Sequence, residues 1–255
     1  MSDYMFKSSN PAFKNNAFSG YGRQYEQKMT IEGTTNKTLI LLAIVVTLSS
    51  IIWSLTYSSI SNGELPILIP ASIAIGSIGG IIMCLVVIFS RKENAAYMAP
   101  IYAAFQGLFV GGVSSIMEVY YPNIVLQAVL LTFGVFFAML IIYKMNWIPV
   151  TQTLRIGIYC AVGSIALVYI ISLIMRLLGS GIPFIHSSGP IGIGFSVLVC
   201  GIAAVCFLLD FDFIEKRVEA GSPKYLEWYA AFGLLVTLVW LYIEILHLLA
   251  KLRDR

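Results

Sequence analysis

Charge is scarce in this chain of 255 residues: Asp, Glu, Lys and Arg make up 11% of it, whereas 58% of the residues are apolar. Soluble domains carry about 25% charged residues, and the mean hydropathy of +0.86 also excludes an ordinary soluble domain. Histidine and cysteine are few as well, with two and four residues. No Cys-x-x-Cys pair occurs, so the sequence predicts neither a zinc site nor a disulfide framework. The composition is that of an integral membrane protein.

Catalytic motifs are absent too. The sequence has no Gly-x-Ser-x-Gly, no His-Glu-x-x-His, no phosphate-binding glycine loop and no Gly-x-Gly-Asp. We therefore expect no enzyme activity and no cofactor. Residues 1–36 contain no apolar run and so lack the pattern of a signal peptide. Their polar composition predicts a disordered tail, followed by a membrane domain over residues 37–255.

Seven apolar runs of about 20 residues follow the tail, each long enough to cross a hydrocarbon core of about 30 Å as a helix. Alternation of polar and apolar residues, typical of an outer-membrane barrel, is missing. The predicted class is therefore an all-α bundle of seven transmembrane helices. The expected spans are 38–58, 67–90, 96–119, 123–144, 154–178, 190–210 and 229–250.

Lys and Arg predict the orientation. Twelve of them fall in the tail through Lys37 and in the connectors 91–94, 144–155 and 211–227, whereas the alternate connectors hold only Arg176. Positive residues accumulate on the cytoplasmic side. We expect a cytoplasmic amino terminus, even though an odd number of spans then places the basic carboxyl terminus on the other side.

Polar residues form a stripe along the last span. They are Thr237, Trp240, Glu244, His247 and Lys251, spaced by three and four positions, so they share one helix face. An ionisable group at the bilayer centre costs about 2.5–3.5 kcal/mol on insertion scales. The stripe should therefore face protein or water, either as part of an ion pathway or because Glu244 pairs structurally with Lys251 or His247.

Other polar residues could line the same pathway. Asp210 ends the sixth apolar run and should face the bundle interior. Asp212, Glu215 and Glu219 fit a solvated connector, although Asp212 is a further possible lining residue. In the third span a second polar stripe contributes Gln106 and Glu118, and these could line a pathway or hold helices together.

The closing sequence LLDFDFIEKRVEAGSPKYLEWYAAFGLLVTLVWLYIEILHLLAKL resembles the last two helices of the Bax-inhibitor-like (transmembrane Bax inhibitor motif) family, most closely its bacterial members. The stretch LYIEILHLL is similar to a family pattern that has Asp where this chain has Glu244. The resemblance implies a bundle with the last helix at its centre, in a bacterial cytoplasmic membrane. It also implies a pH-sensitive calcium leak controlled by a carboxylate pair on helices six and seven, here Asp210 and Glu244, which would bind passing calcium transiently.

Two carboxyl groups in contact inside a membrane cannot both ionise cheaply, so we expect Asp210 and Glu244 to share one proton, whose loss would open the bundle. The expected partners are the lipid bilayer, calcium and protons, and not nucleic acid. One alternative is a non-transporting regulator that uses its tail to bind a membrane protease, a stress- or death-related protein or another membrane protein. A second alternative is a proton-coupled carrier with Glu244 as the relay.

Overall fold

The computed structural model describes residues 27–61, 67–178 and 187–254. This part of the chain forms seven helices that are long and apolar enough to cross a membrane, which confirms the predicted all-α class and the number of spans. A single 3₁₀ turn, η2, lies between the second and third of them. The elements are α2 (Ile31–Ser61), α3 (Leu68–Phe89), η2 (Lys92–Asn94), α4 (Ala95–Tyr120), α5 (Ile124–Lys144), α6 (Gln152–Leu177), α8 (Pro190–Glu219) and α9 (Leu226–Arg253).

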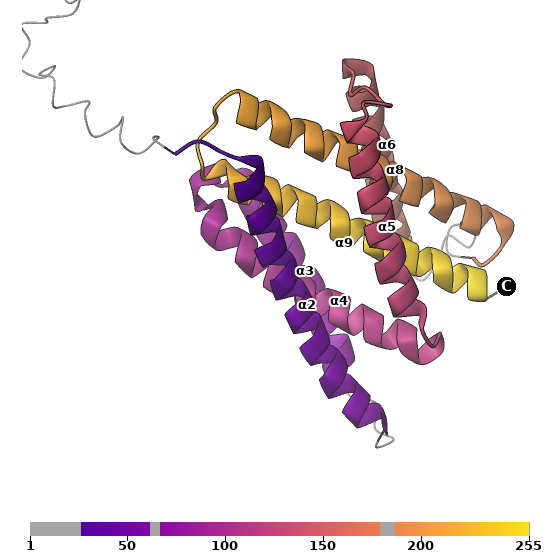
Figure 1. Cartoon of the computed structure of the whole chain (residues 1–255). Coiled ribbons are helices and arrows are strands. Elements are labelled where there is room, and N and C mark those ends of the chain that lie inside the picture. Colours follow the sequence, from indigo (N-terminus) through magenta and orange to yellow (C-terminus); the bar gives the residue numbers. More distant parts are fainter. Residues whose placement is uncertain (1–26, 62–66, 179–186, 255) are drawn as a thin grey trace, which may run out of the picture.

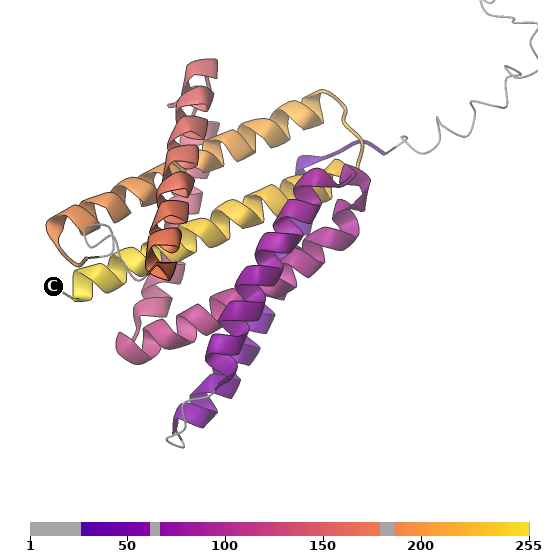
Figure 2. The same cartoon turned by 180° about the vertical axis from the view of Figure 1, so that it is seen from behind.

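The last helix is the centre of the bundle, as expected. Helix α9 contacts α2, α4, α5 and α8, and in Figure 1 it lies between α8 and the group formed by α2, α3 and α4. Helices α5 and α6 cross the α8–α9 pair on opposite faces, so α5 is in front in Figure 1 and α6 in Figure 2. A helix that is apolar on nearly all sides is typically a buried one, and α9 supplies many of the core residues.

Close packing of α2, α3 and α4 depends on glycines. A Cβ atom on Gly76 of α3 would lie 2.4 Å from the backbone nitrogen of Phe109 in α4. A Cβ atom on Gly111 of α4 would lie 2.9 Å from atoms of Ser49 and Ile52 in α2. Small residues at such positions let helix backbones approach closely where no water drives association. Glycines of α3 and α4 therefore make the interfaces of this half of the bundle.

Two helices extend beyond the apolar runs that predicted them. Helix α2 begins at Ile31, so residues 31–36, expected in the disordered tail, are helical, while residues 1–26 lie outside the described part of the chain. Helix α8 continues through Asp212 to Glu219. The expected connector after residue 210 is therefore helical for its first nine residues. Glu215 and Glu219 are exposed, as expected for solvated residues, whereas Asp212 is buried, and the connector between α8 and α9 is only a short turn.

Polar contacts hold the carboxyl-terminal end of α9 against the α4–α5 connector. The hydroxyl of Tyr121 donates a hydrogen bond to the Asp254 carboxylate. This hydrogen bond raises the pKa of the Tyr121 phenol above its usual value. The guanidinium of Arg253 donates to the carbonyl oxygen of Pro122 at 2.6 Å and to Oε1 of Gln127 at 3.0 Å. The end of the central helix is thereby attached to the neighbouring helices.

Candidate functional site: polar residues along the central helix

The polar stripe on α9 faces α6 and α8. Thr237, Glu244 and Lys251 are spaced by seven positions and therefore lie on one face of the helix. Thr237 Oγ1 donates a hydrogen bond of 2.7 Å to Asp210 Oδ2 on α8. Further along, Lys251 Nζ donates one of 2.8 Å to Ser196 Oγ, also on α8. At both of these positions the stripe faces protein, in agreement with one of the two expected environments.

Glu244 is the acidic residue of this stripe. It is only 4% exposed, and Oε1 accepts hydrogen bonds from Tyr169 Oη at 2.8 Å and from Trp240 Nε1 at 3.1 Å. Both donors are neutral. Tyr169 comes from α6, and its ring packs edge-on against Phe195 of α8 with centroids 6.3 Å apart. Glu244 is thus the point at which α6 is attached to the central helix.

Tyr169 was not identified from the sequence. A buried tyrosine hydroxyl usually finds a hydrogen-bond partner, so a tyrosine in the middle of an apolar run was an available signal. The sequence alone, however, does not indicate which helix supplies that partner.

Asp210 and Glu244 do not form the expected proton-sharing pair. Asp210 is hydrogen-bonded to Thr237, which lies seven positions before Glu244 on α9. At a rise of 1.5 Å per residue, Asp210 therefore contacts α9 at a level about 10 Å away from that of Glu244. No hydrogen bond joins the two carboxyl groups in the described part of the chain. The expectation came from the family resemblance of the closing sequence, and a resemblance in sequence does not fix the level at which these two antiparallel helices face each other.

Calcium ligation is limited by the same separation. Carboxylate oxygens lie about 2.3–2.6 Å from a bound calcium ion, so one ion cannot touch Asp210 and Glu244 together across about 10 Å of helix. Within the described residues there is also no group of three or more His, Cys, Asp and Glu side chains. In this structure the two carboxylates have different hydrogen-bond partners and do not form the expected joint site.

Asp212 is buried and paired with cations. Its carboxylate forms an ion pair with Arg155 at the start of α6 and another, of 2.9 Å, with Lys216 one turn further along α8. The residue is 7% exposed. Because α8 continues past residue 210, Asp212 lies inside a helix that packs against α6 instead of in a solvated connector. This pair attaches the start of α6 to α8.

Two of the remaining residues expected to line a pathway, Gln106 and Glu118, lie on α4 and not on α8 or α9. His247 is exposed on α9, three positions after Glu244. Gln106 is half-buried on α4, with its side-chain nitrogen beside Gly80 of α3. The carboxylate of Glu118 accepts hydrogen bonds from the backbone nitrogens of Asn123 at 2.7 Å and Val125 at 3.2 Å. Glu118 therefore stabilises the first turn of α5, where a negative charge is favoured.

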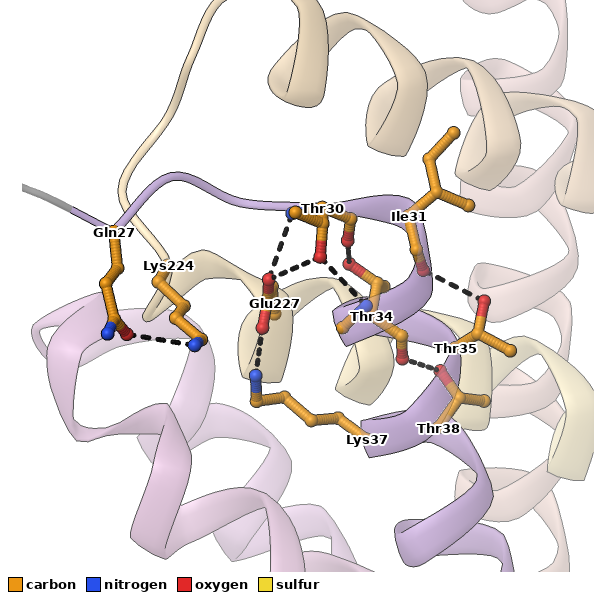
Figure 3. A network of polar contacts seen from close by, with 10 residues as sticks. Gln27, Thr30, Ile31, Thr34, Thr35, Lys37, Thr38, Lys224 and Glu227 are labelled. Atoms are coloured by element: carbon orange, nitrogen blue, oxygen red, sulfur yellow. Dashed lines mark hydrogen bonds and ion pairs between the residues drawn. The ribbon is translucent and has the colours of Figure 1, made fainter.

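A second buried acidic group, Glu227, lies at the start of α9 (Figure 3). Its side chain is fully buried and forms an ion pair with Lys37 of α2. Glu227 Oε1 also accepts hydrogen bonds from the backbone nitrogen of Thr30 at 2.9 Å and from its hydroxyl at 3.1 Å. This network could not be predicted from the sequence, because Glu227 and Lys37 each resemble an ordinary charged residue at the end of a membrane span.

The segment before α2 is attached to the α8–α9 connector beside this network. The backbone nitrogen of Met29 donates to the carbonyl of Ser222 at 2.7 Å, and that of Lys224 donates to the carbonyl of Gln27 at 3.0 Å. Lys224 Nζ also donates to Gln27 Oε1 at 2.9 Å (Figure 3). The start of the described chain and the start of the central helix therefore form one unit.

Comparison with known proteins adds one finding to this geometry. Neither the search of curated proteins nor the search of solved structures gave a match. A family model described as Bax inhibitor 1 like matches residues 10–254, nearly the whole chain. A seven-helix membrane bundle with a central last helix is also what the resemblance of the closing sequence implied. The chain belongs to the Bax inhibitor 1 like family.

Proposed function

We propose that this protein is a pH-sensitive calcium leak channel of the membrane, with Glu244 as its sensor. The observation that supports the proposal best is the environment of Glu244, a buried carboxyl group on the central membrane-length helix whose hydrogen-bond donors are both neutral. An ionisable group at such depth is costly and is typically kept for ion or proton pathways. Packing alone therefore does not explain an acid at this position.

Gating is assigned to the hydrogen bond between Tyr169 and Glu244. A hydrogen bond to an ionised acceptor is roughly twice as strong as one between neutral groups. Protonation of Glu244 therefore weakens the attachment of α6, a helix that packs mainly against α8. On this basis flux increases as the pH falls. The expected sign was the opposite, because it relied on repulsion between two carboxylates in contact.

Calcium conduction is assigned to two successive carboxylates. Asp210 and Glu244 lie about 10 Å apart along α9, by the rise of the helix, so each would bind a calcium ion alone. Calcium sites normally use six to eight oxygen ligands, and one carboxylate supplies at most two of them. Such weak, separate positions suit a leak better than a resident calcium site.

The regulator hypothesis remains the second proposal, and the attachment of residues 27–29 to the α8–α9 connector favours it. A membrane protease, a stress- or death-related protein or another partner bound to the preceding tail would act directly on the start of α9. We further propose that the amino terminus is cytoplasmic, that the membrane is the bacterial cytoplasmic membrane, and that the protein is not an enzyme and needs no cofactor.

The test is calcium entry into liposomes that contain the purified protein, measured between about pH 5 and about pH 8, where a perturbed carboxyl group can titrate. We expect a pH-dependent flux in the wild type and no pH dependence in Glu244→Gln. Glu93→Gln, the same substitution at an exposed position of η2, should behave as the wild type. If well-folded wild-type protein gives no flux at any pH, the leak is refuted, and deletion of residues 1–26 then tests partner binding.

A further inference from the structure

A cavity of about 500 Å³ lies between α2, α4, α5 and α9. The α9 residues that line it, Leu238, Val239 and Tyr242, are about half a helical turn away from Glu244, at 3.6 residues per turn. It is therefore separate from the polar stripe. Val46 of α2 and Leu126 of α5 belong to its lining and are 53% and 61% exposed. The cavity thus opens at the side of a bundle of membrane-length helices, where the surroundings are lipid.

The cavity matches one leaflet of a bilayer in length. Its lining on α2 extends from Leu42 to Trp53, and these twelve positions span about 16 Å at a rise of 1.5 Å per residue. One leaflet contributes about half of a hydrocarbon core of about 30 Å. Most of the wall is apolar, and Val129 and Phe133 of α5 continue it. An extended acyl chain of one leaflet therefore fits along this wall.

Polar groups gather toward the end of the cavity at which α2 and α4 finish. The hydroxyl groups of Ser114 and Tyr242, both lining residues, are hydrogen-bonded to each other at 2.7 Å. Glu118 also lines the cavity, and its carboxylate is held by the backbone nitrogens of Asn123 and Val125. A pocket that is mainly apolar with a few fixed polar groups is typical of a ligand site.

The charged side chains at this end of the cavity indicate which lipid headgroup would bind there. Glu118 presents a fixed carboxylate, and Arg253 is bonded to Pro122 and Gln127 of the following α4–α5 segment. The carboxylate of Asp254 is also held at this connector, by the hydroxyl of Tyr121. Two anions and one cation at one connector complement a headgroup that carries both an ammonium and a phosphate group. We propose that the cavity binds one acyl chain of a zwitterionic amino-phospholipid, with the ammonium group of the lipid at Glu118.

The binding test uses native mass spectrometry of the purified full chain, titrated with dioleoyl phosphatidylethanolamine or with dioleoyl phosphatidylglycerol. The two lipids have identical chains and differ in the headgroup. We expect one bound lipid per protein and about a threefold preference for the ethanolamine lipid, which is the size of a partly exposed ion pair. Glu118→Gln should abolish this preference and leave binding of the glycerol lipid unchanged. Equal binding of both lipids by the wild type would refute the headgroup assignment.

The location is tested by filling the cavity. Val129→Trp places a large ring on the wall of the cavity and should remove the bound lipid. Leu130→Trp is the matched control, because Leu130 is the next residue of α5, is 64% exposed and does not line the cavity. If Val129→Trp lowers the melting temperature, Val46→Trp fills the same cavity from an exposed position. Lipid binding that survives both filling substitutions would overturn the proposal, whereas loss that is confined to them supports it. The readout does not depend on calcium flux.

Discussion

Replacement of Tyr169 by Phe tests the attachment of α6 to the central helix. The substitution removes only the hydroxyl that donates to Glu244 and keeps the ring contact with Phe195, so no cavity is created. A hydrogen bond to a charged group contributes about 1.5–3 kcal/mol, and each 1.4 kcal/mol is a factor of ten in an equilibrium constant. Trp240 still donates to Glu244 in the variant. The ratio of closed to open protein should therefore fall by about tenfold, the lower end of this range.

The assay is calcium flux into liposomes at the alkaline end of the pH range, where the wild type is mostly closed. Tyr169→Phe should raise flux there by about tenfold and flatten the pH profile, with little change in the melting temperature. Tyr159→Phe is the control, since Tyr159 lies on the same helix and is 64% exposed. If Tyr169→Phe has the flux of the wild type at every pH, its hydrogen bond to Glu244 does not hold the closed state and the gating proposal is refuted.

Two further predictions concern stability, measured by thermal unfolding in detergent. Glu227→Gln leaves Lys37 without its buried partner and should destabilise the fold by about 3 kcal/mol. This value is the lower end of the range for broken buried ion pairs, because the side chain of Lys37 is 14% exposed. An unchanged melting temperature would show that the pair contributes little. Gly76→Ala should cost about 1–3 kcal/mol, because the added methyl group meets the backbone of Phe109. Gly157→Ala is the control, since nothing lies within 4 Å of its Cβ position, and equal melting temperatures of the two alanine variants would contradict the packing argument.

The number of membrane helices and the central place of the last one could be predicted from the sequence. The bilayer forces every backbone group in its core into internal hydrogen bonds, so each apolar run of sufficient length becomes a helix. The central place of the last helix was implied by the family resemblance of the closing sequence, and the composition of α9 agrees with it, because α9 is apolar on nearly every side and carries Glu244 at its middle. Both a lipid-facing acid and an unpaired one would be costly, so the face that bears Glu244 had to meet protein or water.

Helix ends could not be predicted in this way. Apolar composition marks the thickness of the bilayer, whereas the helix continues for as long as its residues favour it. The nine residues of α8 after Asp210 are helical although three of them are acidic. The misplaced end led directly to the wrong environment for Asp212, which is buried against Arg155 because that extra length of α8 packs beside the start of α6.

The sequence also does not indicate which residues that are far apart in the chain contact each other. Glu227 and Lys37 are 190 positions apart, yet their ion pair fixes the first turn of α9 to α2. At the opposite end, Tyr121 fixes Asp254. Both ends of the central helix are therefore held by charged contacts, whereas its middle is attached to α6 through Tyr169 and Glu244. Proton uptake shifts the equilibrium between the closed and open bundle most easily where opening breaks the fewest contacts between helices. Helix α6 is accordingly the element whose movement the proposed gating requires.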